Sequence, residues 1–419
     1  MTGDPSRYVI VGGGVAGLVT ARRLAIAGES VTVLEAGDRF GGIVASHTVG
    51  GVVLDSGAES YATRGGTVEA LATGLGLGPD IVTPLASPAW LYRADGVALP
   101  LPATSVLGIP GVPLAADVIA VVGLRSALRA QLDALLPAPY GLRSLTLGDL
   151  VRRRMGTGML EKLVAPVVHG VHSAHPYELD VDRVAPFVRS AMRSEGSLTH
   201  AVRLLRERAT AGSAIAGIRG GVHRLVTELL VDLQNLGVTL ELGARVSSVV
   251  PGSVRVGRRT IRGSVIVAAA GVLEPNQARP ITLATLVVDA PQLDAAPRGT
   301  GVLVTNGAVG VAARALTHST AKWPWLAERT GGLHVLRLSY DSAPDDLAAT
   351  ALADAATLLG VDLPASSLVD HARVEWTRPS PESAAPDGLT SVGEAAGGTG
   401  LAAVVAHAES TAARLLEPS

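Results

Sequence analysis

A glycine-rich turn between two apolar runs constrains the fold of this chain most. Residues 7–11 (RYVIV) are predicted to form a short buried strand, and Val15–Ala27 has the composition and spacing of a helix. Between them, Gly12, Gly14 and Gly17 fit the pattern G-x-G-x-x-G. In that pattern the first glycine permits a tight turn, the second lets the backbone approach a diphosphate, and the third lets helix and strand pack closely.

The residues that follow complete the pattern. Gly28 is expected to end the helix, and Ser30–Leu34 is predicted to form a second strand. Glu35 ends that strand, where its carboxylate can accept hydrogen bonds from ribose hydroxyls. Taken by themselves, the glycines are explained equally well by a tightly packed turn that binds no ligand. Strand, helix, second strand and acid together predict a dinucleotide-binding domain in which the N-terminus of the helix faces the phosphates.

A second glycine turn bears on the choice of cofactor. Arg39, Gly41 and Gly42 follow the acid, where the backbone can approach the same diphosphate. No second G-x-G-x-x-G with its own strand and acid occurs downstream, which argues against a separate domain for NAD. One permanently held cofactor that a diffusible acceptor reoxidises is the simpler interpretation, so we predict a flavin, FAD.

Composition argues against several other functions. The chain has 35 Lys and Arg against 37 Asp and Glu, and this balance argues against nucleic acid as a partner. It has no cysteine, which excludes disulfides, thiolate metal sites and cysteine nucleophiles. No segment has the roughly 20 uninterrupted apolar residues of a membrane span, and the first ten residues show no signal pattern. We expect a cytoplasmic protein. The most hydrophobic segment, Val112–Leu124, is expected to be a buried helix or a lip that contacts the inner face of a membrane.

The rest of the chain predicts domains that are interleaved. Helical spacing extends from Leu114 to about Arg208, another helix is predicted over Val222–Leu236, and residues 284–340 are predicted to be strands. The last segment has the pattern of a strand, a glycine loop and a long helix. We therefore expect an α/β protein of two domains with a helical insertion. The Rossmann-like FAD-binding domain would comprise 1–75, 218–272 and 385–419, the mixed-sheet substrate domain 76–110 and 273–384, and the helical, membrane-facing part 111–217.

These motifs resemble a known family. VIVGGGVAGL followed by VTVLEAGDRFGG is similar to the start of the large flavin group that contains amine oxidases, carotenoid desaturases and protoporphyrinogen oxidases. Later segments resemble the porphyrinogen oxidases in particular: DSGAESYATRG (Asp55–Gly65), LEKLVAPVVHGVHSAHPYELDV (Leu160–Val181), STAKWPW (Ser319–Trp325) and GTGLAAVVAHAESTAARLL (Gly398–Leu416). Many flavoproteins share the N-terminal motif, whereas KLVAPVVHGV is the specific segment.

The resemblance implies which residues hold FAD and the substrate. The residues that would contact FAD are Gly12, Gly13, Gly14, Val15, Ala16, Gly17, Glu35, Ala36, Arg39, Gly41, Gly42, Gly57, Ala58, Glu59, Ser60, Val246, Trp376, Gly393, Glu394, Gly400, Leu401 and Ala402. Arg64 would bind a substrate carboxylate, although a solvated surface position is an equal explanation of this arginine. Gly170 would let a flat macrocycle lie against the backbone, and His172 would pair with a carboxylate.

The resemblance also implies the reaction. Such an enzyme removes six electrons and six protons from a porphyrinogen in haem biosynthesis. Flavin N5 accepts hydride from a bridging methylene, and dioxygen reoxidises the flavin to give hydrogen peroxide. Because pyrrole nitrogen supplies the electron push, no catalytic side chain is expected. By analogy with compact bacterial members, the expected substrate is coproporphyrinogen III, with protoporphyrinogen IX as the alternative. A ferrochelatase is a candidate partner, and the oligomeric state is left open.

Some features depart from the family pattern. His172 and His175 stand where relatives have Tyr and Asp. With His169 they form a trio that resembles no standard zinc pattern and has no nearby acid to complete a site, so no metal is expected. After VEWTRPSPESAAPDG the chain goes straight to LTSVGEA and lacks the segment in which relatives have Pro-Gln-Tyr and a histidine. The alternatives are therefore another flavin oxidase or desaturase of this group, or a low-activity or non-catalytic protein on the same scaffold.

Overall fold

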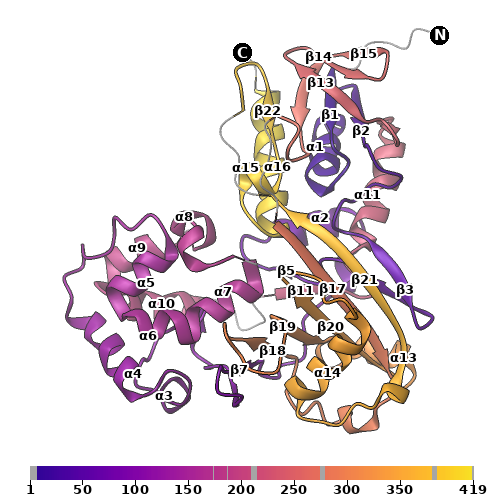
Figure 1. Ribbon diagram of the computed structural model, residues 1–419. Helices are drawn as coiled ribbons and strands as arrows, with labels where there is room; N and C mark the ends of the chain where they lie inside the picture. Colours follow the sequence, from indigo (N-terminus) through magenta and orange to yellow (C-terminus); the bar gives the residue numbers. More distant parts are fainter. Residues whose placement is uncertain are drawn as a thin grey trace. The chain divides into compact units, whose positions relative to one another are not determined.

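The computed structural model describes residues 7–172, 174–185, 187–208, 215–273, 279–379 and 385–417 (Figure 1). The chain forms two compact units. The first contains Met1–Thr83, Ser213–Pro280 and Trp376–Ser419, and the second contains Pro84–Gly212 and Ile281–Glu375. Each unit is therefore assembled from segments that are far apart in the sequence.

A parallel sheet organises the first unit. Its strand order is β12-β2-β1-β16-β22, and each neighbouring pair runs parallel. Every residue of the central strand β1 (Tyr8–Val11) and of β2 (Val31–Leu34) is buried. Nearly continuous apolar runs are typical of parallel strands that are covered on both faces. Helix α1 (Val15–Ile26) connects these two strands, so the predicted strand–helix–strand start is confirmed.

Other elements of the first unit surround this sheet or extend it. They are β3 (Ser46–Val49), β4 (Val52–Asp55), β5 (Tyr61–Ala62), α2 (Thr67–Gly74), β6 (Ile81–Val82), β11 (Ile215–Ile218), α11 (Arg224–Asn235), β12 (Thr239–Glu241), β13 (Val246–Val250), β14 (Ser253–Val256), β15 (Arg259–Arg262), β16 (Ser264–Val267), β22 (Thr390–Ser391), α15 (Glu394–Gly397) and α16 (Leu401–Leu416). β3 and β4 pair antiparallel and form a hairpin before the turn at Gly57.

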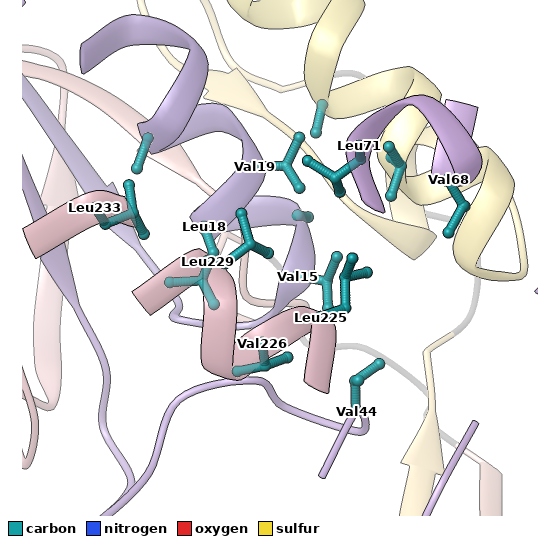
Figure 2. Close-up of a cluster of buried hydrophobic side chains, with 14 of the residues drawn as sticks. Val15, Leu18, Val19, Val44, Val68, Leu71, Leu225, Val226, Leu229 and Leu233 are labelled. Carbon is teal, nitrogen blue, oxygen red and sulfur yellow. The ribbon is translucent and has the colours of Figure 1, made fainter. Parts of the chain in front are cut away.

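Helix α1 is held by an apolar core. It packs against α11 and α16. Figure 2 shows Leu18 of α1 near Leu229 of α11, and Val15 of α1 near Leu225 of α11; all four side chains are buried. Burying one such side chain stabilises the fold by about 1.5–3 kcal/mol. The N-terminal turn of α1 is therefore fixed at the edge of the sheet by packing along the whole helix.

A mixed sheet organises the second unit, in the order β21-β17-β20-β19-β18-β7-β8. β18 and β7 run parallel, whereas β17, β20, β19 and β18 follow one another antiparallel. The elements that belong to the sheet and its surroundings are β7 (Trp90–Tyr92), β8 (Ala98–Pro100), β17 (Arg279–Val288), β18 (Gly301–Val304), β19 (Ala315–His318), α12 (Ser319–Lys322), α13 (Pro324–Thr330), β20 (His334–Tyr340), α14 (Leu347–Leu359) and β21 (Leu368–Arg378).

The second unit also contains a helical part with its own core. Its elements are β9 (Ser105–Val106), β10 (Ile109–Pro110), α3 (Ala116–Val122), α4 (Leu124–Gln131), α5 (Leu147–Met155), α6 (Thr157–Met159), a π-helical turn (Leu160–Val164), α7 (Ala165–His172), α8 (Val181–Val184), α9 (Val188–Glu195) and α10 (Leu198–Arg208). A fully buried ion pair lies inside it, with Arg154 Nε 2.5 Å from Asp133 Oδ1. Arg154 also donates to the carbonyl of Gly196, and Asp133 accepts from the backbone N–H of Thr199, so neither charge is left uncompensated.

The fold class expected from the sequence is confirmed, because the chain combines a parallel Rossmann-like sheet with a mixed sheet. The expectation of strands over 284–340 is wrong at two places, at the 3₁₀ turn Pro291–Leu293 and where α12 and α13 interrupt the strands. Pro324 begins α13 at a position where its missing N–H costs nothing. The predicted boundaries of the two domains and of the helical insertion stay a prediction.

The most hydrophobic segment forms a short helix. In α3 the side chains of Val118, Val121 and Val122 are buried, while Val112 and Leu114 before the helix are exposed. Across the described ranges, no helix has both the length and the apolar character that crossing a membrane requires.

Candidate functional site

The parallel sheet brings several predicted cofactor residues to one edge. Gly12 follows β1, Glu35 follows β2, and Gly393 lies two residues after β22. Because these strands are parallel, their carboxyl ends lie at the same edge of the sheet. In open α/β sheets this is the edge where ligands bind.

The three glycines of the N-terminal pattern have different local environments. Gly12 has φ +110°, and an added Cβ would lie 2.8 Å from the nitrogen of Ala269. An added Cβ at Gly17 would lie 2.1 Å from the carbonyl oxygen of Gly12. Gly14 has φ −71° and ψ 175°, and an added Cβ would meet nothing within 4 Å. The fold therefore requires glycine at 12 and 17, whereas at 14 the missing side chain leaves open space at the N-terminus of α1.

The neighbouring residues complete this turn. An added Cβ at Gly13 would lie 2.4 Å from Cδ1 of Phe40, so that ring packs closely on the turn. Val15 and Ala16 are buried in the first turn of α1, which contains no acidic residue. The N–H groups at this helix end therefore present their partial positive charge without a competing carboxylate in the turn.

Both carboxylate oxygens of Glu35 accept backbone hydrogen bonds. Oε2 accepts from the nitrogen of Gly13 at 2.8 Å, and Oε1 accepts from the nitrogen of Gly37 at 2.7 Å. A carboxylate has about four acceptor positions, so these two bonds leave capacity for hydroxyl groups. Ala36 follows in the exposed turn. Val246 begins β13 close by, because the nitrogen of Ala244 donates to the carbonyl of Glu35 at 2.8 Å.

The second glycine turn lies directly against the first. The nitrogen of Gly41 donates to the carbonyl of Gly13 at 2.8 Å, and Gly14 and Gly41 form a parallel β-bridge. Gly41 and Gly42 both have positive φ, and the exposed Arg39 donates to the carbonyl of Gly42 at 2.8 Å. The structure thus brings the two predicted diphosphate turns together.

The turn after β4 contacts the predicted tryptophan. An added Cβ at Gly57 would lie 1.9 Å from the carbonyl oxygen of Ile43 and 2.1 Å from Cη2 of Trp376. Only glycine therefore lets the indole rest on this turn. Ala58, Glu59 and Ser60 follow Gly57 and are half-buried.

The C-terminal segment supplies the remaining candidates. An added Cβ at Gly393 would lie 3.4 Å from Cβ of Ala16, so this loop lies beside the first turn of α1. Glu394 is mostly buried, and its burial raises the pKa of its carboxyl while Arg378 acts in the opposite direction.

The cap of the last helix is also open. Gly400 caps α16 with φ +90°, and its Cβ position faces open space. Leu401 and Ala402 form the first turn of α16. All of the predicted cofactor residues, including Val246 and Trp376, belong to the first unit.

The predicted substrate residues are divided between the units. Arg64, in the first, lies in an exposed turn after β5, and desolvation by neighbouring groups lowers its pKa. Gly170, in the second, lies in α7, and an added Cβ would be 2.4 Å from Cδ2 of Leu303. Packing within the unit therefore gives an additional reason for this glycine. His172 ends α7, and its side chain lies outside the described part.

The histidine trio has acidic neighbours that the sequence did not indicate. His169 Nε2 lies 3.2 Å from Asp341 Oδ1, and His175 Nε2 lies 3.8 Å from Glu161 Oε2. The hydrogen bond from His169, together with Arg314, lowers the pKa of Asp341 to about 2. Each of these two histidines therefore has one acidic neighbour, which the spacing of the trio did not indicate. Among the residues that the structure describes, no group of three or more His, Asp or Glu is placed to hold a metal ion.

Two residues of the site were not singled out from the sequence. Asp55 accepts hydrogen bonds from the nitrogens of Val222 and His223 at 2.9 and 2.8 Å, which ties the start of the Gly57 turn to the segment before α11. Arg378 lies two positions after Trp376, and in a strand that spacing places both side chains on one face. In the sequence, the available signal for Arg378 was its position two residues after Trp376, which places the two side chains on the same face of a strand.

Comparisons with known proteins identify the family of the chain and several similar proteins. A family model described as flavin containing amine oxidoreductase matches residues 15–273. The chain is 29% identical over 373 residues to the coproporphyrinogen III oxidase of Mycobacterium leprae (strain TN), covering 83% of this chain and 80% of that protein. It is 27% identical over 254 residues to the coproporphyrinogen III oxidase of Staphylococcus aureus (strain NCTC 8325 / PS 47), covering 58% and 54%. A crystal structure titled "putative protoporphyrinogen oxidase", from Exiguobacterium sp. 255-15, has a similar fold, with a TM-score of 0.79, 21% identity, and coverage of 98% of this chain and 99% of that one.

Proposed function

Because the chain belongs to the flavin-containing amine oxidoreductase family, we propose that it is an FAD-dependent oxidase that converts coproporphyrinogen III into coproporphyrin III in haem biosynthesis. The similarity to coproporphyrinogen III oxidases over 83% of the chain carries this proposal. The open space beside the backbone of Gly14 supports the proposal that FAD binds there. Protoporphyrinogen IX is the alternative substrate.

FAD would lie along the carboxyl edge of the parallel sheet. Gly12–Gly17 and the second glycine turn would hold the diphosphate at the N-terminus of α1. Glu35 would accept ribose hydroxyls with its remaining acceptor positions. Gly57–Ser60, Trp376 and Gly400–Ala402 would border the flavin ring.

The chain's own contribution is to bind and orient the substrate. When bound, FAD would supply a two-electron acceptor for hydride from the bridging methylenes, with dioxygen as the final oxidant and hydrogen peroxide as its product. The pyrrole N–H proton leaves as its nitrogen donates electrons, so no side chain needs to act as a base. Holding the macrocycle in a reactive geometry and keeping water away from it accounts for the catalytic effect of the protein.

The substrate contacts follow from charge and space. Arg64 would form paired hydrogen bonds with a propionate, since a guanidinium offers two parallel N–H donors to a carboxylate. Gly170 would offer its backbone to the macrocycle on a side other than the one that Leu303 occupies. His172 would pair with a further carboxylate. Within Val112–Leu124, the exposed side chains of Val112, Leu114 and Leu124 would contact the inner face of a membrane, and a ferrochelatase would receive the product.

A side-by-side assay tests the proposal. Coproporphyrinogen III and protoporphyrinogen IX are added separately, in air, to protein loaded with FAD, and porphyrin fluorescence and peroxide are followed. We expect both signals to rise faster with coproporphyrinogen III than in buffer. Fluorescence that rises no faster than in buffer, while an amine or a carotenoid bleaches the flavin absorption, would assign the chain to another substrate. A protein that shows no flavin absorption in excess FAD would refute the proposal and favour a non-catalytic protein on the same scaffold.

A further inference from the structure

Arg378 and Glu394 lie close together at the cofactor edge of the sheet, and each side chain has a buried polar atom without a hydrogen-bond partner. Arg378 Nε is 3.3 Å from Glu394 Oε1, and the side chains keep only 23% and 15% of their surface exposed. Within the described part of the chain, neither Nη1 of Arg378 nor Oε1 of Glu394 has a hydrogen-bond partner, although both atoms are buried. Buried polar atoms are almost always hydrogen-bonded, so two unsatisfied ones in the same place need an explanation.

The surroundings of this pair consist of predicted cofactor segments. Arg378 leaves β21 on the same side as Trp376, which rests on the turn at Gly57. Gly393, the residue before the glutamate, lies beside the first turn of α1. The pair is therefore connected on one side to the turn after β4 and on the other to the helix end that faces the open space at Gly14.

The unsatisfied atoms of Arg378 and Glu394 indicate which kind of ligand group would bind there. A guanidinium and a carboxylate together are close to neutral, and they leave one donor and one acceptor unsatisfied. A diphosphate would be repelled by the carboxylate that it has to approach. A hydroxyl group accepts one hydrogen bond and donates another, so it satisfies both atoms at once.

We propose that Arg378, together with Glu394, binds the ribityl hydroxyls of FAD. The inference rests on the FAD binding proposed above and adds Arg378 to the residues that hold the cofactor. Arg378 acts as a positioning residue, because it contributes a donor and also offsets the cost of burying the carboxylate of Glu394.

The test compares two ligands on the apoprotein. FAD carries a ribityl chain, whereas ADP carries the same diphosphate without one. Titrations are made on the wild type, Arg378→Met, Glu394→Gln and the double variant. We expect Arg378→Met to raise the dissociation constant of FAD by about 10- to 100-fold and to leave that of ADP within about twofold. Because both side chains would bind the same hydroxyls, the double variant should be weaker than either single variant by less than the product of their effects.

Two further variants separate binding from folding. Arg373→Met removes an exposed arginine of the same strand, which pairs with Glu375, and it should leave both dissociation constants unchanged. Arg378→Lys keeps the charge and should show the same selective loss of FAD binding, to a smaller extent, even if Arg378→Met does not fold. A wild type that binds neither ligand would refute the proposed function itself. A wild type that binds FAD, with Arg378 variants that bind it equally well or lose FAD and ADP together, would overturn the role of Arg378 alone.

Discussion

Replacing Gly14 by alanine tests the open backbone surface without disturbing the fold. The dihedral angles of Gly14, φ −71° and ψ 175°, are allowed for alanine, and the added Cβ would meet nothing within 4 Å. Removing a glycine stabilises the folded state by about 0.4–1 kcal/mol through the unfolded chain. Alanine is a poorer N-cap than glycine by a comparable amount, on the order of 1 kcal/mol at most. The unfolding free energy of the apoprotein should therefore change by less than about 1 kcal/mol.

The same substitution should weaken cofactor binding. Its methyl group would occupy the space through which a diphosphate reaches the N–H groups of α1. Forcing an extra methyl group into a close contact costs about 1–3 kcal/mol, which corresponds to roughly 5- to 150-fold weaker binding. Quenching of flavin fluorescence during titration measures the dissociation constant of FAD. ADP should lose affinity to the same degree, because the diphosphate is common to both ligands.

Gly17→Ala is the matched control for this prediction. At Gly17 the added Cβ would lie 2.1 Å from the carbonyl oxygen of Gly12, so the helix and the strand would have to separate. We expect this variant to lose about 1–3 kcal/mol of stability as apoprotein, whereas Gly14→Ala loses affinity and keeps stability. Wild-type affinity for FAD in a well-folded Gly14→Ala variant would refute the placement of the diphosphate at this turn.

Three further substitutions test other parts of the structure. The hydrogen bond from His169 holds the pKa of Asp341 at about 2, so the carboxylate contributes stability above its unfolded pKa of about 4 and loses it as pH falls toward 2. Because Asp341 is half-exposed, Asp341→Asn should remove no more than about 1 kcal/mol of that acid-dependent stability. Urea unfolding at pH 6 and pH 3 measures the difference. If the variant and the wild type depend on pH identically, the role of Asp341 is contradicted. Asp133→Ala leaves the buried charge of Arg154 uncompensated and should cost about 3–5 kcal/mol in urea unfolding; a loss below about 1 kcal/mol would show that the pair is hydrated. Gly57→Ala should displace the indole that rests on this turn, with a shift in tryptophan emission and weaker FAD binding, and an unshifted spectrum would count against this contact.

The start of the fold could be predicted because its signals are local. The strand, turn, helix and second strand all occur within the first 35 residues, and each has its own pattern of apolar spacing or glycine. The stop at Gly28, which has φ +88°, follows from the same local rule. Neighbouring residues determine these features, so the sequence alone was sufficient for them.

Contacts between distant segments could not be predicted in this way. Asp341 lies 172 positions after His169, and no spacing rule connects them. The segment around Pro324 was predicted to be a strand because its neighbours are, yet it forms two short helices with the buried Trp323 between them. The pairing of Arg378 with Glu394 likewise depends on the loop after β22 lying beside the end of β21.

The glycines of the site show why a sequence pattern cannot by itself separate folding from binding. Gly12 and Gly17 must be glycine because backbone atoms fill the space of a side chain, and Gly57 must be glycine because a carbonyl and an indole do. Gly400 must be glycine because of its positive φ. At Gly14 neither reason holds, since its φ is negative and its Cβ position is open. The fold does not explain this glycine, so a group outside the folded chain is the simplest reason for it, and a diphosphate fits the charge of the helix end beside it.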